Sequence, residues 1–412
     1  MKEIITGLDI GSNKLKLVVG EMYNDKLYVL ACTEAKSNGI KNGLVVNPEQ
    51  ATESFKEVFS KCEEILGIKI KRVICTVPSY YTELLVNDGN TTINREDKTI
   101  NGEDILKCYQ SAVYNVVGQD KEFVNIFPIE FFVDEKSVGL DPKGKKGSKL
   151  SCRCAISVVP KKNIYQILTL LESIGVEVDD ISFNVVADYY EFKTKEYDSS
   201  NVAVVNIGSD ITEIGVFNKG ILVGTENLPL GGRSINKDIA FTYDISKKDA
   251  VRLKEKFGYA NQSGASINET EEVLTKSNEN IKINQYEISG IIYSRTKEIL
   301  ELAKKQINLL TNKEVQYIIM TGGVTEAVGF DLTFMEVFGK DKELNKVMEL
   351  GVRNNKYSSV VGLIKYYYSK LKFRNVTAYT MTEEEQNKLF QVKKKVNNTN
   401  LLGKIYSYFF DN

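Results

Sequence analysis

Two short stretches of the sequence have the residue types of a phosphate-binding turn. GLDIGSNKLKLVVG starts at Gly7, and VVNIGSDITEIGVF starts at Val204. Each predicts two strands joined by a tight turn with Ile-Gly-Ser, and such a turn points successive backbone N–H groups into one concavity that suits a phosphate. One such turn is typical of any β-hairpin. Two copies, one in each half of the chain, indicate a duplicated fold whose halves clamp one ligand from opposite sides.

The two copies differ at the residue that leads the turn. Asp9 leads the first copy, whereas Asn206 leads the second. A third Gly-rich turn follows an apolar strand in VQYIIMTGGV, where Gly322 and Gly323 end the strand. We expect this third turn to lie near the same ligand.

Composition narrows the classes of function. A chain of 412 residues is long enough for two or three domains, at roughly 100 to 200 residues each. The net charge of -1 argues against nucleic acid as the main partner, because phosphate neutralisation needs a basic excess. The sequence has no histidine, which excludes every mechanism that needs a histidine base, relay or metal ligand. Carboxylates, lysines or a bound metal must then carry any chemistry.

Cysteine usage and hydropathy predict a cytoplasmic body. The six cysteines form no C-x-x-C pair, so we expect reduced core or strand residues. The N-terminus runs directly into a strand without the apolar stretch of a signal peptide. No run reaches the roughly 18 apolar residues of a membrane-spanning helix.

Strands and helices alternate around the two hairpins. Residues 4–20 predict the first hairpin, 48–66 a helix and 72–78 a buried strand, an order typical of a mixed sheet backed by helices. From about residue 84 to residue 160, a helix, strands and a Gly/Lys loop predict a compact inserted α+β module. The polar stretch YANQSGASINETEEVLTKSNENIKINQ predicts a loop, and a long amphipathic helix follows it.

The three Gly-rich turns resemble the phosphate 1, phosphate 2 and adenosine motifs of the actin-like ATPase superfamily. Within it, further segments resemble the bacterial cell-division FtsA family in the same order: SNGIKNGLVVN, LPLGGRSINKDIAF, DAVRLKEKFG and LGVRNNKYSSVVGLIKYYY. The resemblance covers nearly the whole chain. It implies an α/β, actin-like ATPase fold of duplicated ribonuclease-H-like halves, with an inserted 1C subdomain and a C-terminal amphipathic helix.

The resemblance also implies a division into subdomains. The expected units are subdomain 1A at 1–83 and 161–200, inserted subdomain 1C at 84–160, subdomain 2A at 201–240 and 300–372, subdomain 2B at 241–299, a linker at 373–399 and a membrane-targeting helix at 400–412.

The implied ligands are ATP and Mg²⁺. Asp9 is expected to hold the Mg²⁺ shell through water. The residues implied to contact the nucleotide are Gly11, Ser12, Asn13, Lys14, Gly208, Ser209, Asp210, Gly322 and Gly323, with Lys254 and Glu255 at the adenine and ribose edge.

The sequence departs from the superfamily pattern where water would be activated. Many actin-like ATPases open phosphate 2 with aspartate and orient the attacking water with Gln or Glu from the preceding helix. Here those positions hold Asn206, a weak catalytic candidate, and Asn184. An asparagine adds no charge for the metal and cannot act as a base. We therefore expect ATP binding with weak or absent hydrolysis.

The last residues predict an amphipathic helix. At about 100° per residue, one side gathers Leu401, Leu402, Ile405, Tyr408 and Phe409 together with Tyr406 and Phe410. This helix could dock on its own domain. The polar linker before it, the aromatic face and the resemblance favour the bilayer interface. A single tail is a marginal anchor, so assembled copies would bind by avidity.

The resemblance implies partners as well. The C-terminal tail of the tubulin-like division protein FtsZ would dock on subdomain 2B, at about residues 243–284, and copies of the chain would assemble through the 1C module at the cytoplasmic membrane, at the division septum. Two alternatives stay open: a PilM-type actin-like scaffold of a membrane machine, and an actin-fold small-molecule kinase. The kinase needs a catalytic aspartate near a substrate hydroxyl, and the sequence offers no convincing candidate.

Overall fold

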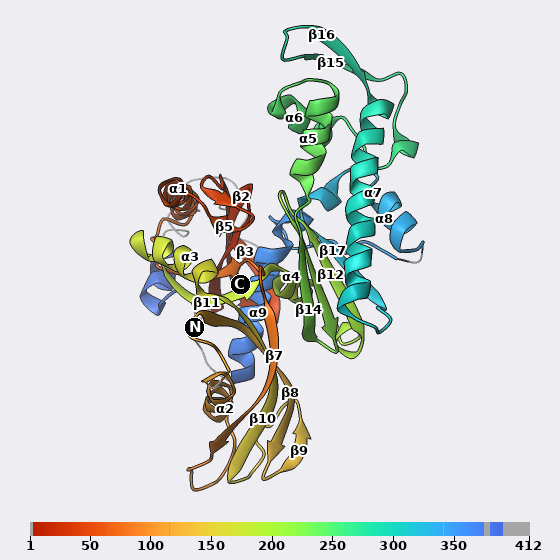
Figure 1. Cartoon of the computed structure of the whole chain (residues 1–412). Helices are drawn as coiled ribbons and strands as arrows, with labels where there is room; N and C mark the ends of the chain where they lie inside the picture. Colours follow the sequence, from red (N-terminus) through yellow and green to blue (C-terminus); the bar gives the residue numbers. More distant parts are fainter. Residues whose placement is uncertain (1–2, 115, 341, 375–379, 390–412) are drawn as a thin grey trace, which may run out of the picture.

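A computed structural model describes residues 3–114, 116–340, 342–374 and 380–389. The described chain forms two lobes built on β-sheets, with a sheet-and-helix module at one end of the first lobe and a helical subdomain beyond the second (Figure 1). The predicted membrane helix at 400–412 lies outside the described residues.

The first lobe is a five-stranded mixed sheet in the order β11-β6-β1-β2-β3. Its strands are β1 (Glu3–Ile10), β2 (Lys14–Tyr23), β3 (Lys26–Lys36), β6 (Arg72–Val77) and β11 (Glu177–Phe183). The first hairpin is β1 paired antiparallel with β2, and β6 runs parallel to β1. Helices α1 (Pro48–Leu66) and α3 (Lys161–Ser173) contact this sheet and each other, and the small ladder β4 (Ile40–Lys41) and β5 (Leu44–Val45) precedes α1.

Local sequence explains the sharp ends of α1. The Asn47 side chain accepts a hydrogen bond from Gln50 N, and Pro48 occupies the first turn, where no amide donor is needed. Gly67 ends the helix in the left-handed region, at φ 72°.

The second lobe repeats the strand order of the first. Its sheet is β14-β13-β12-β17, with β12 antiparallel to β13 and parallel to β17. The strands are β12 (Asn201–Ile207), β13 (Thr212–Asn218), β14 (Ile221–Leu228) and β17 (Tyr317–Thr321), backed by α7 (Gln285–Leu310). This order matches β3-β2-β1-β6, which confirms the predicted duplication.

The inserted module is a separate antiparallel sheet covered by one helix. The sheet has the order β7-β10-β8-β9. Its elements are β7 (Glu83–Thr92), α2 (Gly102–Tyr114), β8 (Lys121–Val133), β9 (Lys136–Gly139) and β10 (Lys149–Pro160). Cys108, Cys152 and Cys154 are buried in its core, and all six cysteines are free thiols, as the sequence predicts.

The outer end of the second lobe holds α5 (Gly232–Thr242), α6 (Lys247–Lys256), η2 (Gln262–Gly264), β15 (Thr270–Leu274) and β16 (Asn280–Asn284). The expectation of a loop across this polar stretch is wrong for the hairpin that β15 forms with β16. Only Val273 and Ile283 in this hairpin are buried apolar residues, too few to give a strand pattern.

Two helices lie between the lobes. α4 (Asn184–Phe192) packs mainly on the second sheet, and α9 (Ser358–Arg374) packs on the first sheet and against α4. The short elements η1 (Tyr197–Ser199), η3 (Gly323–Glu326), α8 (Phe330–Phe338) and η4 (Asn355–Tyr357) complete the chain. The sequence predicts that residues 300–372 belong to subdomain 2A, whereas α9 packs on the first lobe. This contact joins residues far apart along the chain, so the order of the elements in the sequence does not reveal it.

Residues 380–389 also pack on the first lobe, where the sequence analysis expects a linker from residue 373. Thr380, Met381 and Leu389 are buried there. The Thr6 amide donates a hydrogen bond to Thr380 Oγ1 at 2.8 Å. Four buried residues in this segment, Gln386 among them, give no periodic signal in the sequence, so the polar composition of the segment predicts a linker. Within the described ranges, no helix is long and apolar enough to cross a bilayer.

The crossing of α4 and α9 is close enough to require glycine at position 362. A Cβ at this position would lie 1.9 Å from the Ala187 carbonyl oxygen. We expect Gly362→Ala to lower the free energy of unfolding by about 3 kcal/mol, because the helix backbones must separate. Urea unfolding measures the change. Gly264→Ala is the matched control, since its nearest neighbour is an ordinary contact with Tyr259 at 3.4 Å. Equal stability of the two variants would contradict the prediction.

Candidate functional site

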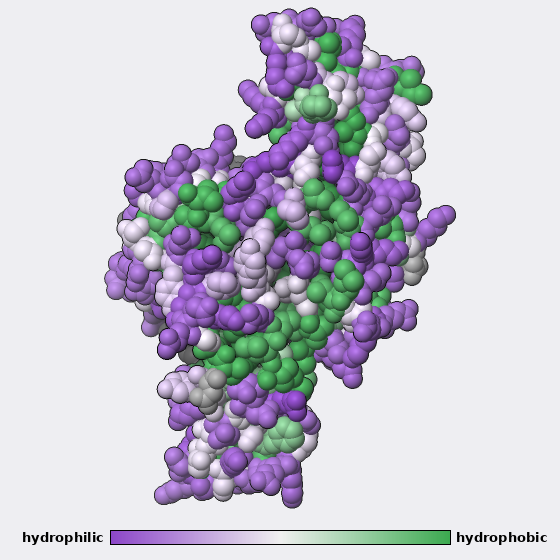
Figure 2. Space-filling model, in the orientation of Figure 1, coloured by the Kyte–Doolittle hydropathy of each residue, from purple (hydrophilic) through white to green (hydrophobic). Residues whose placement is uncertain are grey.

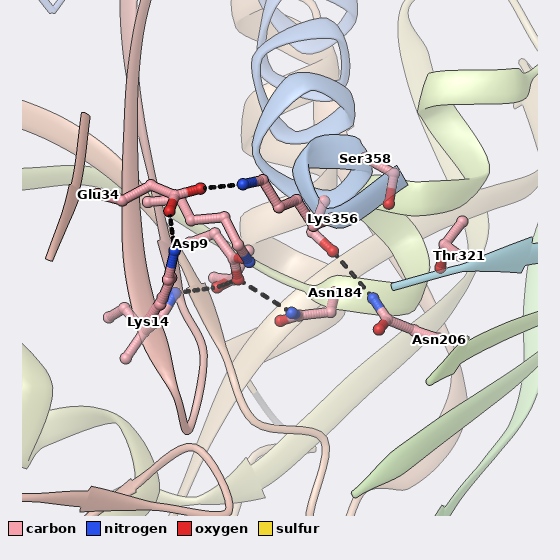
Figure 3. A network of polar contacts seen from close by, with 12 residues as sticks. Asp9, Lys14, Glu34, Asn184, Asn206, Thr321, Lys356 and Ser358 are labelled. Carbon is pink, nitrogen blue, oxygen red and sulfur yellow. Dashed lines mark hydrogen bonds and ion pairs between the residues drawn. The ribbon is translucent and has the colours of Figure 1, made fainter. Parts of the chain in front are cut away.

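The two hairpin turns face each other across a cleft between the lobes. The cleft has a volume of about 630 Å³, within the usual range of small-molecule sites. Besides the two turns, its walls include the turn after β17 with η3, the start of α5 and residues of α6 and η4. Figure 3 shows the polar network at its floor, with Asp9 and Asn206 on opposite walls.

Most of the predicted nucleotide residues line this cleft. They are Asp9, Gly11, Ser12, Asn13, Lys14, Asn206, Gly208, Ser209, Lys254, Glu255, Gly322 and Gly323. Asp210 is not among them. Its carboxylate pairs with the Arg233 guanidinium at 2.8 Å, and Arg233 itself lines the cleft. Arg233, at the start of α5, therefore presents a cation to the cleft beside the turn where the sequence predicts an acid.

Asp9 is a buried carboxylate with three side-chain donors. Lys16 Nζ lies 2.6 Å from Asp9 Oδ2, while Asn184 Nδ2 and Thr76 Oγ1 donate to Oδ1 at 3.1 and 3.2 Å. The ion pair with Lys16 compensates the buried charge. Asn184, which the sequence aligns with the water-orienting position, lies at the start of α4 and donates to Asp9.

The second turn is locked onto the start of α5 by its backbone. The amides of Gly232 and Arg233 donate to the carbonyls of Gly208 and Ser209 at 2.9 and 2.8 Å. A Cβ at Gly231 would lie within 2.7 Å of both carbonyl oxygens, so this approach needs glycine.

Gly322 has a similar steric requirement at the end of β17. Its φ is +90°, and a Cβ there would lie 2.4 Å from the Ile207 carbonyl oxygen and 2.8 Å from Asn206 Oδ1. The third Gly-rich turn can therefore approach the second turn closely.

Behind Asn206 lies a fully buried carboxylate, Asp188 on α4. Asn206 Nδ2 donates to Asp188 Oδ2 at 2.6 Å. Burial raises the pKa of Asp188 to about 6, against the opposing effect of its hydrogen bonds from Ser358, Asn206 and Thr321. A pKa of about 6 leaves the group ionised at neutral pH. Nothing local in the sequence marks Asp188, an acid on a mostly apolar helix, as part of this site.

The cleft is basic although the whole chain is close to neutral. Eight lysine and arginine residues line it, against four aspartate and glutamate residues. Lys16 is among the residues that the sequence analysis misses. It follows Lys14 by two positions on β2, so the strand period of two is the signal that could have found it.

Glu34 on β3 links the first turn to the start of α9. Lys356 Nζ lies 2.8 Å from Glu34 Oε1, and Lys14 Nζ pairs with Oε2 (Figure 3). Burial alone would raise the pKa of Glu34, but its hydrogen bonds with Lys14, Lys356 and Tyr357 hold it at about 2. Both lysines line the cleft, so Glu34 holds two cations at its edge.

Glu213 is a second acidic group that the sequence analysis misses. It lies opposite Asn206 on β13, lines the cleft and is 7% exposed. Burial, together with the charges of Asp188 and Asp9, raises the pKa of Glu213 to about 8, although a hydrogen bond from Ser79 opposes the rise. Glu213 is therefore mostly protonated at neutral pH and is not a free base.

Comparison with known proteins identifies the family. The model of "Cell division protein FtsA" matches residues 203–362, and that of "SHS2 domain inserted in FTSA" matches residues 81–158. The chain is 28% identical to the FtsA of Bacillus subtilis, over 88% of this chain and 83% of that protein. It is 27% identical to the FtsA of Streptococcus pneumoniae, over 88% and 79%.

The chain belongs to the FtsA family. The match to the inserted domain covers β7 to β10 almost completely, which confirms the predicted 1C module. Members of the FtsA family are cell-division proteins, and this chain has their actin-like fold.

Solved structures agree on the fold. A PilM protein in a PilM–PilN type IV pilus biogenesis complex superimposes with a TM-score of 0.59 at 12% identity, over 90% of this chain and 98% of that one. MreB5 of Spiroplasma citri, solved bound to ADP, gives 0.55 at 13% identity, over 90% and 99%. At these identities both show the fold alone. The sequence leaves open an FtsA-type and a PilM-type scaffold. The FtsA family models, and not the PilM superposition, decide between them.

The donor set of this FtsA-family cleft fits a nucleotide that brings its own Mg²⁺. Among the described residues, no group of three or more Cys, Asp or Glu side chains is placed to hold a metal ion. Mg²⁺ keeps several waters and is commonly bound by one or two carboxylates plus substrate phosphates. Asp9 can supply such a carboxylate. The basic residues and the two turns suit the phosphates.

Glu213 makes the stability of the chain depend on pH. Its pKa is about 8 in the folded chain against 4.5 ordinarily, so the unfolded chain loses its proton first as pH rises. Stability therefore falls through this window by up to about 1.4 kcal/mol per pH unit. We expect Glu213→Gln to be more stable than the parent chain, by a margin that grows from about pH 5 to about pH 8.

Urea unfolding at both pH values measures this margin. Exposed Glu226 on β14 provides the control variant Glu226→Gln, which removes a glutamate charge outside the buried site. A constant margin for Glu213→Gln would show that its carboxyl titrates normally.

Proposed function

We propose that this chain is an actin-like ATP-binding protein of cell division that assembles at the cytoplasmic face of the membrane and tethers FtsZ. Membership of the FtsA family carries the proposal, because the family match spans both the second lobe and the inserted module. The basic cleft between two Gly-containing turns supports the nucleotide, as does the ADP in the MreB5 relative.

ATP would bind with its phosphates between the two turns. Lys14 and Lys16 on the first turn and Arg233 beyond the second supply positive charge from both lobes. Asp9 would orient the water shell of Mg²⁺, and Lys254 and Glu255 on α6 would lie at the nucleoside edge. Bound Mg²⁺ would neutralise charge on the phosphates.

Hydrolysis is expected to be slow or absent. No group near the second turn is arranged as a base among the residues that line the cleft. Asn184 donates to Asp9, Asn206 donates to Asp188, and Glu213 is mostly protonated. Weak water activation costs phosphoryl transfer several orders of magnitude in rate.

Asp9→Asn tests the nucleotide site. We expect the parent chain to bind ATP more tightly with Mg²⁺ than without it, and Asp9→Asn to lose about tenfold of the Mg²⁺-dependent affinity because the carboxylate is gone. Calorimetric titration with and without Mg²⁺ measures both. Asp331→Asn, on the exposed start of α8, is the control. Turnover by the parent chain above roughly 1 per second would contradict slow hydrolysis.

Membrane attachment is assigned to Leu401, Leu402, Ile405, Tyr408 and Phe409, which lie outside the described residues. Lys393, Lys394 and Lys395 would add positive charge near anionic lipid. Each assembled copy would add one such tail, so assembly and attachment would reinforce each other.

Assembly and FtsZ binding are assigned to opposite ends of the molecule. Copies would meet through the 1C module, and hydrophobic residues gather on the face where this module adjoins the second lobe (Figure 2). Exposed apolar side chains include Val86 on β7 and Val223 on β14. The FtsZ tail would dock at about residues 243–284, where Ile267 and Leu274 are exposed.

Liposome sedimentation tests attachment and tethering together. We expect the full chain to sediment with anionic liposomes, more so with ATP, and to carry FtsZ with it. A chain truncated before Thr399 is expected to stay in the supernatant, because the apolar face is lost. Phe409→Ala should weaken sedimentation, whereas Ser407→Ala, on the polar face, should not. Equal sedimentation of the full and truncated chains would refute the membrane assignment.

A further inference from the structure

A buried carboxylate lies directly behind the residues that line the floor of the cleft. Asp188 is fully buried, one layer behind Asn206. It accepts hydrogen bonds from four side chains on three different elements: Asn206 on β12 at 2.6 Å, Thr321 on β17 at 2.9 Å, and Ser358 and Ser359 on α9 at 2.7 and 3.0 Å. Four donors to one carboxylate are the pattern expected for a buried charge and not for a buried neutral acid.

This carboxylate determines which way the Asn206 amide points. An ionised carboxylate only accepts hydrogen bonds, so the amide nitrogen must face it. The second N–H of Asn206 donates to Ser359 Oγ at 3.0 Å, which fixes the amide plane. The amide oxygen is then turned toward Gly322 and the cleft, where a Cβ at Gly322 would lie 2.8 Å from it.

The pair Asn206–Asp188 therefore presents an acceptor oxygen with a negative charge directly behind it. A hydrogen bond from the amide to a carboxylate polarises the amide, and in a low-dielectric surrounding the charge of Asp188 is weakly screened. In the first turn, the carboxylate of Asp9 itself faces the cleft. In the second turn, the Asn206 amide faces the cleft, and the negative charge lies behind it on Asp188.

We propose that Asp188 is a positioning residue of the nucleotide site: it orients Asn206 and supplies the negative charge that the second turn lacks toward a water of the Mg²⁺ shell. This inference rests on the proposed binding of Mg²⁺-ATP. It assigns Asp188 a role beyond holding α4, β17 and α9 together, which the same hydrogen bonds also achieve.

A reciprocal exchange of the two side chains separates the two roles. The test compares the parent chain with D188N, N206A and the double variant N206D/D188N, by calorimetric titration of ATP with and without Mg²⁺ and by urea unfolding. The exchange keeps one amide and one carboxylate in contact but brings the carboxylate to the cleft. Tyr189→Phe is the control for lost stability alone. The Tyr189 hydroxyl donates a hydrogen bond to Asp198 Oδ1 at 2.9 Å, and this contact lies outside the cleft.

We expect D188N and N206A each to lose about tenfold of the Mg²⁺-dependent ATP affinity, with affinity in the absence of Mg²⁺ changed less than about twofold. The exchange variant should recover the parent affinity to within about threefold. Tyr189→Phe should lower stability and leave the Mg²⁺ dependence unchanged.

Parent-like Mg²⁺ dependence in D188N would overturn the inference, even if its stability falls. If D188N does not fold, N206A and the exchange variant decide: parent-like affinity in N206A, or failure of a folded exchange variant to bind, would overturn it. Absence of ATP binding by the parent chain would instead refute the proposed function on which the inference rests.

Discussion

The close crossing of α4 and α9 is the constraint on which the rest of the structure depends. Their backbones approach so closely that Gly362 has no room for a Cβ beside the Ala187 carbonyl. Because α9 packs on the first sheet and α4 mainly on the second, this contact sets how the two sheets face each other. The two hairpin turns are at the same edge of their respective sheets. A fixed crossing therefore holds both turns on one cleft.

Burying Asp188 at this crossing has a cost that the surrounding donors must offset. An unpaired buried charge costs several kcal/mol, and four hydrogen bonds to Asp188 compensate it here. The donors come from both lobes, so they are in place only when the lobes have their present arrangement. The same residues thus take part in the hydrogen-bond network of the site and in the packing between the lobes, so a change at residue 188 affects both.

Local patterns predict the parts of the molecule that are local. Each hairpin shows two apolar strands joined by a glycine turn, so its position and the facing of Asp9 and Asn206 follow from the sequence. Contacts that close over long separations leave no such signal. The return of α9 to the first lobe, the packing of Thr380 beside Thr6 and the ion pair of Asp210 with Arg233 all depend on which faces meet in space. The site role of Asp188 leaves no local signal for the same reason, because most of its partners lie far along the chain.

The two halves of the duplicated fold use their carboxylates differently, and this asymmetry favours binding over catalysis. Asp9 faces the cleft but is paired with Lys16, so its charge is already compensated. Asp188 keeps its charge but is separated from the cleft by the Asn206 amide. Glu213, the third acid within reach, is mostly protonated. A polyphosphate entering this basic cleft would meet cations and oriented acceptors, and none of these three acids is a free base facing it. This asymmetry fits the proposed binding of a nucleotide and its metal with little activation of water.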